Sequence, residues 1–193
     1  MPITKLEITG LILSGGRGRR VKGLDKGWIE YQGRPLIVGQ VNWLKPQVSK
    51  IVISANRNLS QYKTLNCSVL KDDDESYAGP LQGIKLALQQ LETSWLFVLP
   101  VDVPNLPGSI VDSVSRNLSG TRMAYYLASE ERDHYLNLII HKSALDPLLR
   151  FLETGNARVK DFLQQINAQR LKVDIPEKQF ANLNQLADYQ SIV

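Results

Sequence analysis

Four short apolar runs in the first half of the chain have the length and composition of buried β-strands. They are rich in Val, Ile and Leu, and polar or glycine-containing segments follow them, as is typical of strands. The runs cover residues 6–14 (LEITGLILS), 50–55 (KIVISA), 67–71 (CSVLK) and 95–101 (WLFVLPV). The last run is apolar throughout, which indicates a strand that is covered on both faces of a parallel sheet.

Two helices are predicted between these strands. One opens at Pro35 and continues to about Val48, with apolar residues at helical spacing and Pro46 near its end. The other has Gly79 as its N-cap and Pro80 as its first residue. Strands that alternate with helices in this way predict right-handed βαβ crossovers and a doubly wound, mostly parallel α/β sheet with helices on both faces, a Rossmann-like fold.

The second half of the chain is less regular. Residues 122–128 and 134–140 predict two strands around the polar turn 129–133, which we interpret as a β-hairpin excursion. The other predicted elements are two helices, a strand and a closing helix, over residues 145–152, 159–166, 171–175 and 184–193. Because no repeat, linker or low-complexity segment interrupts the chain, residues 1–193 are read as a single domain.

The composition is that of one globular domain. The chain has 193 residues, of which 43% are hydrophobic, enough to bury a substantial core. Its one cysteine, Cys67, can form no internal disulfide, which favours a reducing compartment. Lys5 and Glu7 interrupt the first apolar segment, so it does not resemble a signal peptide, and no apolar run approaches the roughly 20 residues of a membrane span. We therefore expect a soluble, cytoplasmic protein, and a monomer.

The positive charge is confined to one glycine-rich loop. The net charge is +4, and residues 17–34 hold six basic and two acidic residues, which accounts for all of it. A nucleic-acid-binding protein usually spreads its basic residues along a stripe that follows the phosphates. The distribution favours a compact polyanion as ligand, and neither nucleic acid nor a membrane as partner.

The segments that follow the predicted strands carry the candidate chemistry. In an open α/β sheet, ligands bind beyond the carboxyl ends of the strands. The residues in question are Ser14, Gly15, Gly16, Arg19 and Lys26 after the first strand, Asn56 after the second, Asp72 after the third and Asp102 after the fourth. Glycines let backbone N–H groups turn toward an anion, and the arginine and lysine side chains suit the phosphates of a nucleoside triphosphate.

Two common phosphate-binding motifs do not match this loop. A P-loop requires Lys and Ser or Thr after its last glycine, but Leu24 and Asp25 follow Gly23. A dinucleotide fingerprint requires a third glycine where Val21 stands. The loop therefore predicts a triphosphate that is held partly by the side chains of Arg19 and Lys26.

The run LILSGGRGRRVKGLDKG resembles the signature of the molybdenum cofactor guanylyltransferases, approximately LAGGxxxRMGxxDKG. Further matches follow in chain order: SANR resembles NANR, Asp72 followed by GPLQG resembles D…GPLAG, and PVDVP resembles PxDxP. Arg132-Asp133-His134, Arg158-Val159 and Asn182-Leu183-Asn184 resemble the family's RDH, RRV and NxN. The resemblance covers about residues 9–190, and the ordered set is far more specific than any single motif.

The resemblance implies transfer of GMP from GTP to the phosphate of Mo-bound molybdopterin, with Mg²⁺ as cofactor and pyrophosphate as second product. It also implies a nucleotide-diphospho-sugar transferase-like fold, a GTP and Mg²⁺ site in the N-terminal half, and a pterin site in the C-terminal half. Transient contacts with molybdenum cofactor enzymes or their chaperones are a further expectation.

Residue by residue, the resemblance implies a nucleotide site, a metal site and a pterin site, and the chemistry of the reaction adds a catalytic set. The nucleotide site would include backbone groups of Leu13, Ser14 and Gly15, together with Gly16, Lys26, Asn56, Asp72 and Asp102. Asp102 would also hold Mg²⁺, and the pterin site would include Arg158, Asn182 and Asn184. Arg19, Lys26 and Asp102 would be catalytic, because positioning and charge stabilisation suffice when the acceptor phosphate is already a competent nucleophile.

This chain departs from the family pattern in two places. Val21-Lys22 replaces Met-Gly in the phosphate loop, and Tyr135 replaces the proline after the histidine, with Asn137 nearby. The competing functions are a cytidylyltransferase of the molybdenum cofactor, another nucleotidyltransferase acting on a sugar or isoprenoid phosphate, and a non-catalytic nucleotide-binding paralogue. The Ser14-Gly15-Gly16 loop with Asp25-Lys26 favours GTP, and retention of Lys26 and Asp102 favours catalysis.

Overall fold

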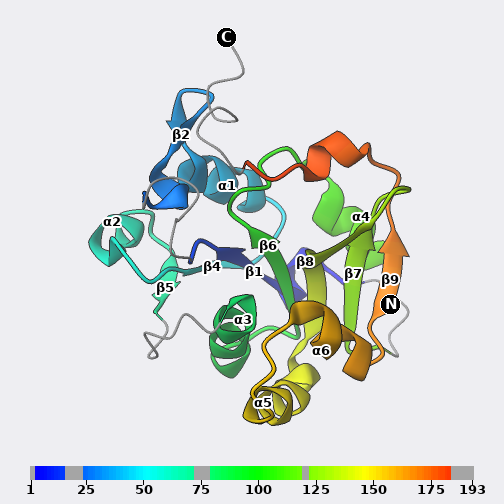
Figure 1. Cartoon of the computed structure of the whole chain (residues 1–193). Coiled ribbons are helices and arrows are strands. Elements are labelled where there is room, and N and C mark those ends of the chain that lie inside the picture. Colours follow the sequence, from blue (N-terminus) through cyan, green and yellow to red (C-terminus); the bar gives the residue numbers. More distant parts are fainter. Residues whose placement is uncertain (1–2, 16–23, 72–78, 119–121, 184–193) are drawn as a thin grey trace.

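Seven strands form one mixed sheet in the computed structural model, which describes residues 3–15, 24–71, 79–118 and 122–183 (Figure 1). In spatial order the strands are β5 (Ser68–Leu70), β4 (Lys50–Ser54), β1 (Ile8–Leu13), β6 (Trp95–Pro100), β8 (Asp133–His141), β7 (Ala124–Ala128) and β9 (Gln169–Lys172). The four strands β5, β4, β1 and β6 are parallel, as the apolar runs predict. The mostly parallel α/β sheet is thereby confirmed.

The predicted hairpin is part of this sheet and not an excursion from it. β7 and β8 pair antiparallel, and β8 also pairs antiparallel with β6, so that Phe97 lies opposite Ile139. β8 thereby pairs with the backbone N–H and C=O groups on the edge of β6 that does not face β1. Buried residues of β8 also extend the core. β9 then adds parallel to β7 and completes the sheet.

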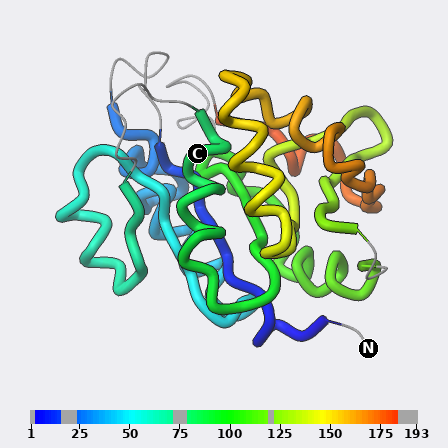
Figure 2. Tube along the Cα trace, turned by 90° about the horizontal axis from the view of Figure 1, so that it is seen from below, coloured from blue at the N-terminus to red at the C-terminus, as the bar shows by residue number. Residues whose placement is uncertain are grey.

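Helices cover both faces of the sheet (Figures 1 and 2). One face carries α1 (Leu36–Leu44) and α4 (Ile110–Arg116), and the other carries α3 (Pro80–Gln89), α5 (Leu145–Glu153) and α6 (Val159–Gln165). The smaller elements are α2 (Leu59–Lys63), the 3-10 helices η1 (Lys5–Glu7), η3 (Lys26–Trp28), η4 (Lys142–Ala144) and η5 (Glu177–Phe180), and the ribbon of β2 (Glu30–Tyr31) and β3 (Arg34–Pro35). None of the helices in the described part of the chain is long and apolar enough to cross a membrane.

The core consists of one apolar cluster on each face of the sheet. Successive side chains of a strand point to opposite faces, so Ile8 and Ile12 of β1 pack with α1, whereas Leu11 packs with α3. All six residues of β6 are buried, which confirms that this strand is covered on both sides. β1 and β6 thus lie inside the sheet, with residues of both faces packed in the core.

Several element boundaries differ from the sequence prediction for local reasons. The first strand begins at Ile8, because Thr4 and Glu7 close a capping box around η1. α1 ends at Leu44, shortly before Pro46, which cannot continue a helix. β9 ends at Lys172 because its partner strand β7 ends at Ala128.

The short helices α2 and α4 lie in segments for which the sequence pattern predicted no element. The predicted closing helix over residues 184–193 lies outside the described residues.

Gly10 allows α1 to sit close against the centre of the sheet. A Cβ atom at this position would lie 2.4 Å from Cδ2 of Leu44, which is fully buried. Because the leucine has no room to move away, β1 requires a residue without a side chain at this point.

We predict that Gly10→Ala destabilises the protein by about 1–3 kcal/mol, the usual cost of overpacking a core. Urea unfolding would show a lower midpoint at an unchanged slope. Gly108→Ala is the matched control, because a Cβ at Gly108 has no neighbour within 4 Å. Equal midpoints for the two variants would contradict the close packing of Leu44 on β1.

Candidate functional site

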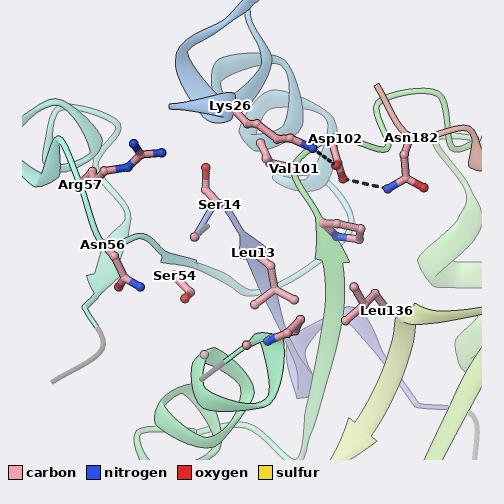
Figure 3. A pocket seen from close by; sticks show the side chains of 15 residues that line it. Leu13, Ser14, Lys26, Ser54, Asn56, Arg57, Val101, Asp102, Leu136 and Asn182 are labelled. Carbon is pink, nitrogen blue, oxygen red and sulfur yellow. Dashed lines mark hydrogen bonds and ion pairs between the residues drawn. The ribbon is translucent and has the colours of Figure 1, made fainter. Parts of the chain in front are cut away.

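A pocket of about 320 Å³ opens at the carboxyl ends of the parallel strands (Figure 3). Its walls come from the ends of β1, β4 and β6, from the first turn of α3, from Leu136 on β8 and from Asn182. The volume falls within the range of about 300–1,000 Å³ that is typical of small-molecule sites. The pocket therefore lies where an α/β sheet is expected to bind its ligand.

Asp102 lies in the wall of the pocket, two residues after the end of β6, and its carboxylate has two partners (Figure 3). Lys26 Nζ lies 2.7 Å from Oδ2, and Asn182 Nδ2 donates to Oδ1 at 3.0 Å. The Asp102 side chain is 13% exposed and that of Lys26 24%, so the ion pair is partly shielded from water. One carboxylate thus joins the loop after β1 to the C-terminal segment.

Gln40 holds the backbone on both sides of Asp102. This buried residue of α1 donates from Nε2 to the carbonyl oxygens of Val101, at 3.3 Å, and Val103, at 2.8 Å. Sequence reasoning missed Gln40, although the sequence carries a signal for it. Gln40 lies four residues from both Leu36 and Leu44, so it shares their buried face and must find polar partners there.

Lys26 is the first residue of η3, and Asp25 caps this short helix. The Asp25 carboxylate accepts a hydrogen bond from the backbone N–H of Gly27 at 3.1 Å. Arg57, which also lines the pocket, donates to the carbonyl oxygen of Leu24 at 3.3 Å. The segment that carries Lys26 is therefore attached to the segment after β4.

The ends of the central strands are joined directly to each other. Ser14 N–H donates to Ser54 O at 2.8 Å, and Val101 N–H donates to Leu13 O at 3.0 Å. The first turn of α3 packs closely against the end of β4, since a Cβ atom added at Gly83 would lie only 2.6 Å from Ser54 Oγ. The floor of the pocket is consequently part of the hydrogen-bonded and closely packed sheet.

The segment that carries Asn182 is anchored by Glu177. Its carboxylate accepts hydrogen bonds from Ser129, Arg132 and His134, the last at 3.0 Å. Burial alone would raise the pKa of Glu177, but these hydrogen bonds outweigh it and hold the pKa below its ordinary value. Phe180 stacks on the His134 ring with centroids 3.8 Å apart, which fixes the chain shortly before Asn182.

Most of the predicted site residues that the structure describes line this one pocket: Leu13, Ser14, Gly15, Lys26, Asn56, Asp102 and Asn182. Arg158 is exposed at the N-cap of α6 and is not among the lining residues. The residue before it, Ala157, lies close to Gly79, which lines the pocket: a Cβ atom added at Gly79 would be 3.9 Å from the Ala157 carbonyl oxygen. Arg158 therefore follows directly after a residue that is next to the pocket. Gly16, Arg19, Asp72 and Asn184 lie outside the described residues.

We predict that Gln40→Met lowers the free energy of unfolding by about 1–3 kcal/mol, because two buried carbonyl oxygens lose their donor. Urea unfolding measures the loss. Gln61→Met is the matched control, since Gln61 is an exposed helix residue and such changes usually stay within about 0.5 kcal/mol. A Gln40→Met midpoint equal to that of the control would mean that Gln40 does not support the Asp102 loop.

Comparison with known proteins places this chain in a family. The model of the MobA-like NTP transferase domain matches residues 10–171. The chain is 39% identical over 181 residues to a molybdenum cofactor guanylyltransferase of Yersinia pestis (strain Pestoides F), a match that covers 94% of this chain and 92% of the relative.

Solved structures agree on the fold. Molybdopterin-guanine dinucleotide biosynthesis protein A from Archaeoglobus fulgidus superposes with a TM-score of 0.77 at 21% identity, covering 94% of this chain and 95% of the other. The 4-diphosphocytidyl-2C-methyl-D-erythritol synthase from Anaerococcus prevotii superposes with a TM-score of 0.70 at 9% identity, covering 96% and 94%. From the family match and the extended sequence identity, we conclude that the chain is a nucleotidyltransferase of the MobA-like family and belongs with the molybdenum cofactor guanylyltransferases.

Proposed function

We propose that this protein transfers GMP from GTP to the phosphate of Mo-bound molybdopterin, forming the guanine dinucleotide cofactor and releasing pyrophosphate. The observation that carries the proposal is the meeting of Lys26, Asp102 and Asn182 in one pocket at the strand ends. The relative that is 39% identical over 94% of the chain is named for this activity. The expected nucleotide and acceptor residues thus converge on the Asp102 carboxylate.

The nucleotide half of the site supports binding of a triphosphate. Lys26 contributes a point charge for the phosphates, and Arg57 adds a second cation at the pocket wall. The Ser14 N–H already donates to Ser54, so backbone donors for the phosphates are expected from Gly15 onward. Gly16, Arg19 and Asp72 complete the proposed nucleotide set.

The reaction requires positioning more than proton transfer. An oxygen of the pterin phosphate attacks the α-phosphorus of GTP, a new P–O bond forms, and the bond to the β-phosphate breaks. Since the attacking phosphate oxygen is already anionic, no general base is needed. Two polyanions must nevertheless approach each other, and Lys26 and Arg19 are proposed to offset their repulsion.

The donor set at Asp102 fits a Mg²⁺ ion. Asp102 is the single carboxylate that lines the pocket within the described residues, and Mg²⁺ needs only one or two carboxylates besides phosphate oxygens and waters. In the structure the Lys26 ammonium group neutralises this carboxylate, at 2.7 Å from Oδ2. When bound, Mg²⁺ would neutralise charge on the phosphates, and we propose that Lys26 then turns from Asp102 to the nucleotide.

The acceptor half is proposed to lie on the Asn182 side of the pocket. Asn182 donates a hydrogen bond to Asp102, and Ala157, the residue before Arg158, lies next to Gly79 of the pocket wall. A pterin phosphate held by Asn182, Asn184 and Arg158 would therefore lie next to the residues that bind GTP.

GTP in the presence of Mg²⁺ should raise the melting temperature more than CTP, UTP or ATP does. A ligand at about 100 times its dissociation constant stabilises the folded state by about 2.7 kcal/mol, a shift that a thermal scan detects easily. A larger shift with CTP would instead support a cytidylyltransferase.

Asp102→Asn should lower the rate of guanylyl transfer to molybdopterin by about 10²–10³-fold, because a preorganised charge at the reacting phosphates is lost. Pyrophosphate release measures the rate. Asp112→Asn is the matched control, since Asp112 pairs with Arg116 on the exposed surface of α4. Near-normal turnover of Asp102→Asn at ordinary Mg²⁺ would refute the role of Asp102.

A further inference from the structure

A buried tyrosine hydroxyl joins the end of β1 to the loop that carries Lys26. Tyr62 comes from α2 and is completely buried. Its hydroxyl lies 2.7 Å from Ser14 Oγ and 2.7 Å from Asp25 Oδ1. Tyr62 does not line the pocket, so any effect on a ligand must pass through its neighbours.

The direction of these hydrogen bonds follows from the proton that each group carries. The Asp25 carboxylate can only accept, so the Tyr62 hydroxyl donates to it and accepts from Ser14. Burial, followed by the hydrogen bond to Asp25, raises the pKa of Tyr62 above its ordinary value. The hydroxyl therefore keeps its proton, and the bond to Asp25 is charge-assisted.

Asp25 connects this hydroxyl to the backbone around Lys26. The same Oδ1 atom accepts from Gly27 N–H at 3.1 Å, and Oδ2 accepts from Asn58 Nδ2 at 3.1 Å. Three groups from two segments thus converge on one carboxylate directly before Lys26.

The residues after Lys26 also contact Tyr62. A Cβ atom at Gly27 would lie 2.4 Å from the Tyr62 hydroxyl and 2.5 Å from Ser14 Oγ, so only glycine fits there. The Trp28 ring packs edge-on against Tyr62 with centroids 5.4 Å apart. Residues 25, 27 and 28 thus lie against Tyr62, while the Lys26 side chain extends to Asp102.

We propose that Tyr62 is a positioning residue, whose hydroxyl holds the Asp25–Gly27 turn so that Lys26 faces Asp102 and the triphosphate. The inference rests on the proposed function for the identity of the ligand, but not for the position of Lys26. Ser14 extends this network from the Tyr62 hydroxyl to the end of β1.

The first test is GTP affinity, measured by calorimetric titration at a temperature where every variant is folded. Tyr62→Phe should weaken affinity about 3- to 10-fold, and Lys26→Ala roughly 10- to 150-fold. In the double variant Tyr62→Phe should add nothing to the loss from Lys26→Ala, because it acts through that lysine. A purely structural role would leave the affinity of the folded protein unchanged, and fully additive losses would also overturn the proposal.

Tyr31→Phe is the matched control for loss of a buried tyrosine hydroxyl. Tyr31 is buried, donates to Asn105 Oδ1 at 3.3 Å and does not line the pocket. It should lose stability without losing GTP affinity. Weakening equal to that of Tyr62→Phe would show that the effect is not specific to the Lys26 turn.

The second test needs no nucleotide, so it separates this inference from the proposed function. Acetic anhydride labelling, read by mass spectrometry, should modify Lys26 several-fold faster in Tyr62→Phe, relative to the exposed Lys50 of the same molecule. Should the wild-type protein bind no GTP while this difference persists, the proposed function fails and the positioning role stands. Unchanged labelling overturns the positioning role.

A second variant covers the case in which Tyr62→Phe does not fold. Asp25→Asn retains the shape of the side chain and removes the negative charge of the group to which Tyr62 and Gly27 donate hydrogen bonds. It should increase Lys26 labelling in the same way, and unchanged labelling would overturn the proposal equally.

Discussion

The ion pair between Lys26 and Asp102 is the contact on which the site depends, because it joins loops from the ends of the two central strands. Partly buried charges are costly unless each has a partner in good geometry. The parallel pairing of β1 with β6 brings the two loops to the same edge of the sheet. Gln40 hydrogen-bonds the backbone next to Asp102, and Asn182 hydrogen-bonds the Asp102 carboxylate. Asp25 caps the short helix that begins with Lys26.

Close packing behind the site fixes the backbone that carries these side chains. Gly10 lets α1 approach β1, and Gly83 lets α3 approach the end of β4. Gly27 lets the Lys26 turn approach Tyr62. Each glycine lies where a methyl group would collide with a neighbouring atom, so the positions of the helices and of the loop are coupled to the strand ends.

The antiparallel half of the sheet anchors the segment that carries Asn182, where we propose that the acceptor binds. β8 extends the sheet from β6, and its residue His134 helps to bind Glu177, which anchors the segment leading to Asn182. Lys26 and Asn182, which come from opposite ends of the chain, therefore meet at the Asp102 carboxylate.

The sequence by itself determined the central strands and thereby the residues at their carboxyl ends, among them Lys26, Asn56 and Asp102. Buried parallel strands appear as continuous apolar runs, and ligands bind where such strands end. Only the tertiary structure decided how these residues are held, because the partners lie far apart in the chain. Asp25 and Tyr62 are separated by 37 positions, and Asp102 and Asn182 by 80, so no local pattern marks either pair. Long-range hydrogen bonds of this kind arise from strand order and helix packing, which a periodic pattern of apolar residues does not specify.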